Sequence, residues 1–111
     1  MTPALDEAMA LTMRMGKALH VYGTPAHRLE EAMSLLSRKF GLQGQFFSTP
    51  TSILGAFGEI PQQRSFLVRV EPGDVNLEKL SALDALLGEL LEESLPPQKA
   101  LLRLEAILQT P

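Results

Sequence analysis

A run of hydroxyl side chains in the middle of the chain is the first feature that could do chemistry. The candidate residues are two threonines, a serine and two arginines: Thr49, Thr51, Ser52, Arg64 and Arg69. Hydroxyls and backbone N–H groups can bind a carboxylate when an arginine supplies the positive charge. The pattern therefore predicts a site for a small carboxylate ligand. The alternative is that these hydroxyls only satisfy backbone groups around Pro50.

Charged side chains further upstream offer a second kind of chemistry. Glu31 can face inward and form an ion pair with Arg69, at the edge of the same site. Such buried pairs are often retained for geometry more than for stability. The alternative is that Glu30 and Glu31 are two solvated helix charges.

His27 allows two further hypotheses, of metal binding and of catalysis. It lies one helical turn from Glu31, but one imidazole and one carboxylate are too few ligands for zinc, so we predict no metal site. His27 as base, Thr51 or Ser52 as nucleophile and Glu31 as the third group would form a small hydrolase. The chain lacks a Gly-x-Ser-x-Gly turn, and we favour a protein without catalysis.

The elements that must position these residues are strands in the middle of the chain. Residues 43–71 form the one stretch that we interpret as β-structure. Apolar and polar residues alternate most clearly over 64–71, and shorter patterns cover 45–49 and 51–57. Because the connections are short, we predict a three-stranded antiparallel meander. Gly55 inside the second strand predicts either a close approach of another group to the backbone or a local twist.

Helices are predicted on both sides of the strands. Apolar residues recur at steps of three and four over 3–22, 25–40, 77–91 and 97–108. Thr2, Thr24 and Asn76 are the predicted N-caps, and Gly23 the left-handed residue that ends the first helix. The wide leucine stripe of 77–91 predicts contact with both the sheet and another helix. If part of this stripe is left uncovered within the monomer, we predict that it contacts a second copy of the chain or a membrane domain. The fold class is α+β, with a three-stranded antiparallel sheet packed against two helical pairs in the order ααβββαα.

Length and charge set limits on function. The 111 residues fit one domain, residues 1–111, with 45% hydrophobic residues and no cysteine for disulfides or thiolate metal sites. The net charge is −3, and residues 71–111 hold eight acidic against three basic side chains. This acidic half argues against a nucleic-acid partner. We expect no signal peptide and no membrane span, since a basic region followed by an apolar run, or about 18 consecutive apolar residues, is missing.

Three short motifs, in order, resemble one known family. They are the stretches 23–33 (GTPAHRLEEAM), 49–53 (TPTSI) and 69–80 (RVEPGDVNLEKL). Together they are similar to the N-terminal domain of threonine/serine exporter-like proteins. The closing stretch 102–107 (LRLEAI) resembles the last helix before that family's membrane part. The resemblance covers nearly the whole chain.

The resemblance implies a soluble, cytoplasmic-side domain of a system that exports threonine, serine or similar small metabolites, and some relatives are linked to dicarboxylates. The implied partner is a multi-helix membrane transport domain, in the same or a separate chain, at the inner face of the cell membrane. We expect a role in assembly, gating or sensing of a small amino acid or dicarboxylate, with no cofactor. The alternatives are the small hydrolase above and a structural module that forms a homo-oligomer.

Overall fold

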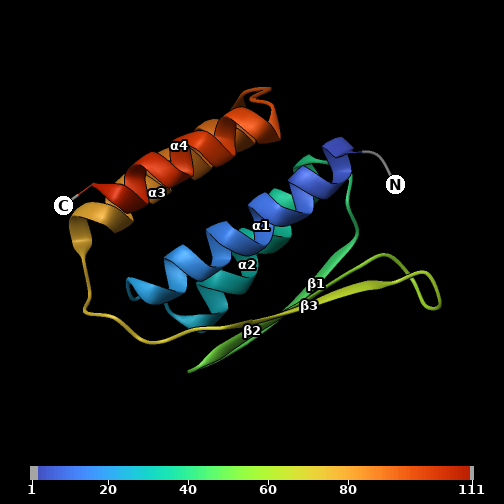
Figure 1. The fold of residues 1–111 in the computed structure, drawn as a ribbon, viewed down its shortest axis with the longest axis horizontal. Helices are drawn as coiled ribbons and strands as arrows, with labels where there is room; N and C mark the ends of the chain where they lie inside the picture. The colour runs from blue at the N-terminus through green and yellow to red at the C-terminus, as the bar shows by residue number, and fades with distance from the viewer. Residues whose placement is uncertain (1–2, 111) are drawn as a thin grey trace.

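The structure is a computed structural model that describes residues 3–110. Its elements are α1 (Pro3–Val21), α2 (Ala26–Lys39), β1 (Gly44–Thr49), β2 (Ser52–Phe57), β3 (Arg64–Arg69), α3 (Leu77–Glu92) and α4 (Pro97–Gln109) (Figure 1). The predicted α+β fold class and the order ααβββαα are confirmed. The element boundaries agree with the sequence patterns to within about two residues, because Gly and Pro punctuate nearly every connection.

The three strands form one antiparallel sheet in the order β1-β2-β3. Pro50 and Thr51 form the two-residue connection between β1 and β2, so Thr49 is paired with Ser52. Side chains of adjacent residues point to opposite faces of a sheet. Ile53 and Phe57 of β2 are buried on the inner face, whereas Leu54 between them is exposed on the outer face. The rings of Phe46 and Phe57 meet edge to face on the inner side, with their centroids 5.5 Å apart.

The molecule has three layers: the sheet, the pair α1–α2, and the pair α3–α4 (Figure 1). Helices α1 and α2 contact the strands, and α3 and α4 pack on the side of α1–α2 that faces away from the sheet. The predicted contact between α3 and the sheet is therefore wrong. Leu83, Leu86 and Leu90 of α3 are buried against helices only, because α1 and α2 already occupy the sheet's inner face.

Helix α1 is the centre of the core, since it lies between the sheet and α3–α4. Its fully buried large side chains are Met9, Leu11, Met15 and Leu19. Methionine and leucine fill this core because the chain has few aromatic residues. The one buried hydroxyl of the helix, on Thr12, donates a hydrogen bond of 2.8 Å to the Ala8 carbonyl oxygen. This bond satisfies a polar group that would otherwise destabilise the core.

The predicted caps have different outcomes. Asn76 caps α3 as predicted, since its side chain accepts a 3.0 Å hydrogen bond from the Lys79 N–H. The Thr24 cap is wrong, because Pro25 occupies the N-cap position of α2 and no side chain caps that helix. Thr2 lies outside the described residues. Gly23 has the predicted left-handed backbone, with φ of 109°.

Gly55 gives the close approach that the sequence predicted. A Cβ atom at this position would overlap the sulfur atom of Met13, which packs from α1 onto the sheet. The glycine therefore lets α1 lie directly against β2.

Candidate functional site

The hydroxyl residues form a compact turn between β1 and β2. Thr49 Oγ1 and Ser52 Oγ lie 2.7 Å apart and share a hydrogen bond, and the Thr51 N–H donates to Thr49 Oγ1 at 3.3 Å. The Thr49 hydroxyl therefore serves the backbone of its own turn, as the alternative interpretation proposed. Thr51 itself is exposed at the tip.

Two side chains that sequence reasoning did not assign to the site hold this turn in place. His20, at the end of α1, bonds through Nε2 to the Thr49 carbonyl oxygen at 2.7 Å. Glu30 of α2 accepts hydrogen bonds through Oε2 from the Ser48 N–H at 2.9 Å and from the Ser48 hydroxyl at 3.1 Å. Ser48 belongs to an edge strand, so the Glu30 carboxylate binds an N–H group that the sheet does not use.

Replacing Glu30 with Ala is expected to destabilise the protein by about 1–3 kcal/mol, because the part-buried Ser48 N–H loses its acceptor. Chemical denaturation of both proteins measures this change in the free energy of unfolding. The matched control is Glu31 to Ala, at an exposed neighbouring position, with an expected change within about 0.5 kcal/mol. Equal effects of the two substitutions would show that Glu30 does not fix β1.

The two candidate arginines lie at opposite ends of β3. Arg69 is paired with Ser52 across the sheet and is exposed on the outer face. Arg64 is paired with Phe57 instead, forms an ion pair with Asp6 at 2.5 Å, and lies over the Phe66 ring. The structure thus brings Arg69 together with the hydroxyl turn and places Arg64 beside the start of α1.

Glu31 and His27 lie apart from the hydroxyl turn. Glu31 is exposed and lines a small hollow of about 160 Å³ between α2 and α3, together with Arg28 and Asp84. That hollow lies on the helices, whereas Arg69 is on the outer face of the sheet. His27 is exposed in the first turn of α2, and the imidazole that contacts the turn is that of His20.

The outer face of the sheet carries side chains in three rows across the strands. One row is polar, with Thr49, Ser52 and Arg69; the next is apolar, with Phe47, Leu54 and Leu67; the third contains Gln45, Ala56 and Ser65. The apolar row is 59%, 44% and 69% exposed, in that order. No helix of the described residues covers this face (Figure 1).

This uncovered row is unusual for a sheet in a small domain, because each of its three large side chains is exposed beside the next. A shallow hollow of about 270 Å³ lies next to it, lined by residues of all three strands. Contiguous exposed apolar surface of this kind marks interaction sites. The leucine stripe of α3, by comparison, is mostly covered by α1, α2 and α4.

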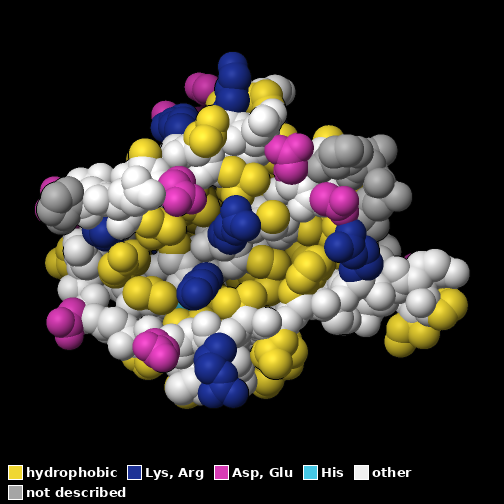
Figure 2. All heavy atoms as spheres, in the orientation of Figure 1, with side chains coloured by type: hydrophobic (Ala, Val, Ile, Leu, Met, Phe, Trp, Pro, Cys, Tyr) yellow, Lys and Arg dark blue, Asp and Glu magenta, His cyan; other side chains and the backbone are white. Residues whose placement is uncertain are grey.

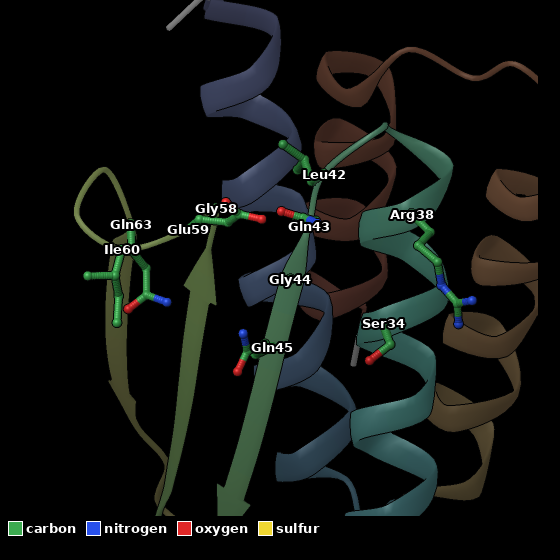
Figure 3. Close-up of a pocket in the computed structure, with 10 residues that line it drawn as sticks. All are labelled: Ser34, Arg38, Leu42, Gln43, Gly44, Gln45, Gly58, Glu59, Ile60 and Gln63. Atoms are coloured by element: carbon green, nitrogen blue, oxygen red, sulfur yellow. The ribbon is translucent and has the colours of Figure 1, made fainter.

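A hollow of about 610 Å³ lies at the other end of the sheet (Figure 3). Its lining includes amide side chains, among them Gln43, Gln45 and Gln63. Arg38 is the one cation in the lining, and in Figure 3 it extends along the side of α2 away from the strands. The hollow contains none of the six residues that the sequence marked as candidates, and its charged groups do not converge on one point.

Two general features of the described residues bear on function. Within residues 3–110, no three His, Cys, Asp or Glu side chains gather as a metal site would require. Each helix in this range is too short or too polar to cross a lipid bilayer.

Comparison with known proteins identifies the family. Residues 10–111 match the model of the family described as "ThrE: Putative threonine/serine exporter". Proteins named pheromone-regulated membrane protein 10 are similar: the one from Debaryomyces hansenii is 39% identical over 99 residues, and the one from Yarrowia lipolytica is 37% identical over 100 residues. These matches cover 87% and 88% of this chain. No solved structure matches it.

The chain therefore belongs to the threonine/serine exporter family, as its motifs predicted. It spans 10% and 8% of the length of these two relatives, whose name describes them as membrane proteins. The match starts within α1 and continues through α4, so it includes the hydroxyl turn and the whole sheet.

Proposed function

We propose that this chain is the cytoplasmic-side domain of a threonine/serine exporter-like system and that it docks onto the multi-helix membrane transport domain. The observation that carries the proposal is the uncovered apolar row of Phe47, Leu54 and Leu67 in a member of this family. The contact would assemble the exporter or gate it. Catalysis has no part in the proposal.

The outer face is suited to docking because its exposed apolar side chains come from three different strands. Their positions are fixed by the pairing of Phe47 with Leu54 and of Leu54 with Leu67. Such a rigid surface loses little conformational entropy when it binds. A few well-packed side chains near the centre of a protein interface contribute most of the binding energy, about 2 kcal/mol or more each.

The polar row beside it supports a sensing role for the same face. Arg69 lies across from Ser52, and Thr49 is on the other side of Ser52. One guanidinium and two hydroxyls can bind the carboxylate of a small amino acid or a dicarboxylate. A ligand at this row would lie next to the docked transport domain, and so would link substrate concentration to the contact.

Replacing Leu54 with Asp is expected to weaken binding to the membrane transport domain at least tenfold, because the substitution puts a charge in the middle of the apolar row. Binding is measured by titrating the detergent-solubilised transport domain with the purified chain. Repeating the titration with threonine, serine and succinate tests the sensing role, for which an affinity that changes with ligand is expected.

The matched control is Leu102 to Asp, which adds the same charge at an exposed leucine of α4 and is expected to leave the affinity unchanged. Equal affinities of the two variants would contradict docking through the sheet. An affinity independent of all three metabolites would remove the sensing role alone.

A further inference from the structure

The free edge of the sheet is β3. The Val70 N–H, just after this strand, donates to the Thr51 carbonyl oxygen, just before β2, at 2.8 Å. Hydrogen-bonding residues alternate along an antiparallel strand, so the N–H groups of Ser65, Leu67 and Arg69 point away from the sheet. Among residues 3–110, these three N–H groups have no hydrogen-bond partner. At the opposite edge, α2 lies against β1, and its Glu30 binds the Ser48 N–H.

A line of residues on α1 runs beside this free edge. Asp6, Ala10, Arg14, Lys17 and Val21 are spaced by three or four residues and so share one side of the helix. At one end, Asp6 pairs with Arg64 at the start of β3. At the other end, the Val21 carbonyl oxygen accepts a 3.3 Å hydrogen bond from the Gly73 N–H, just after β3. Arg14 and Lys17 therefore lie between these two contacts, alongside the strand.

The free edge is consequently basic on both sides. Arg14 and Lys17 are exposed on the α1 side, and Arg69 is exposed on the outer face. Figure 2 shows Lys and Arg side chains over the middle of this side of the molecule, with hydrophobic surface between them and most Asp and Glu side chains toward its margins. These cations attract a negatively charged strand at this edge and disfavour a neutral or positively charged one.

We propose that the edge of β3 binds an extended acidic segment of a partner as a fourth strand. Adding a strand satisfies the N–H groups of Ser65, Leu67 and Arg69. Side chains of the added strand alternate between the two faces, so one set lies near Arg14 and Lys17 and the other set continues the row that ends at Leu67. The segment recognised therefore alternates acidic and apolar residues.

Charge distinguishes this partner from a second copy of the chain. Pairing β3 with β3 of another copy around a twofold axis brings Arg14 and Lys17 of both copies toward each other, and like charges oppose that contact. The proposal goes beyond docking through the outer face, since it depends on the free N–H groups and on the basic flank of α1. Either proposal can fail without the other.

The test titrates the ¹⁵N-labelled chain with a synthetic peptide of alternating Glu and Val, and follows each amide by NMR and hydrogen exchange. The amides of Ser65, Leu67 and Arg69 are expected to gain protection, and affinity to fall as salt is added. The double variant R14E/K17E is expected to bind at least tenfold more weakly. Its matched control is R28E/K39E, with the same charge change at exposed positions of α2, which contacts the other edge strand.

A second variant tests the backbone directly. Leu67→Pro removes an N–H that faces away from the ladder, a position where an edge strand accepts proline, and is expected to abolish binding while circular dichroism stays unchanged. If that variant loses its fold, Ser65→Pro tests the same point. Equal binding of a Lys–Val peptide, unprotected edge amides, self-association through β3, or binding of phosphatidylserine vesicles in place of the peptide would overturn the proposal.

Discussion

Replacing Ile53 with Asp is expected to abolish the folded state. Ile53 is 0% exposed and points from the central strand β2 into the layer of α1 and α2. An unpaired carboxylate in this place costs several kcal/mol, which is comparable with the total stability of about 5–15 kcal/mol for a domain. Circular dichroism on heating is expected to show no cooperative transition for the variant at neutral pH.

The neighbouring residue gives the control for this prediction. Leu54 is next to Ile53 in the same strand, yet it is 44% exposed on the outer face. Leu54 to Asp is therefore expected to keep a cooperative transition and to lose at most about 1 kcal/mol. If both variants unfold, the outer face is part of the stabilising core, and if both stay folded, the assignment of the two faces is wrong.

The sequence predicted the elements well because local signals mark them. Gly23 is left-handed at the end of α1, Asn76 caps α3, and residues 64–69 alternate as a strand should. The fold class follows from this order, since short connections force neighbouring elements to pack. The Thr24 cap was wrong because α2 begins at Ala26, one residue later than predicted. Pro25 therefore takes the N-cap position that the sequence pattern gave to Thr24.

The layering was harder to predict. The leucine stripe of α3 is wide enough to contact two neighbours, and periodicity alone does not say that both neighbours are helices. The uncovered row on the sheet could not be predicted from the sequence either. Phe47, Leu54 and Leu67 belong to three separate strands, and only the pairing register of the strands places them side by side.

Some of the candidate residues lie together in the structure and others do not, and register explains this as well. Thr49, Ser52 and Arg69 do come together, because the two-residue turn and the pairing of β2 with β3 place them in one row. The same register puts Arg64 at the opposite end of β3, beside Phe57. Glu31 lies at the hollow between α2 and α3, away from the hydroxyl turn. Glu30 was given no role in the site, since a carboxylate next to another on a helix resembles an ordinary solvated pair. Its partner, the Ser48 N–H, becomes visible only when β1 is known to be an edge strand.

Export by the complete system is expected to depend on the outer face of the sheet. If the domain docks through Phe47 and Leu54, two carboxylates on this surface remove the contact and leave the domain folded. The effect on transport is expected to be a loss of most of the efflux if, as proposed, the docked domain assembles or gates the transport domain. The same change at Leu102 of α4, which is 68% exposed, is expected to leave export intact.

The most direct measurement is the efflux of radiolabelled threonine from cells that carry the complete exporter with Phe47 and Leu54 both replaced by Asp, at an expression level matched to the unmodified system. Efflux is expected to fall at least tenfold, with the Leu102 to Asp control unchanged. Normal efflux from the doubly substituted exporter would contradict docking through the outer face of the sheet.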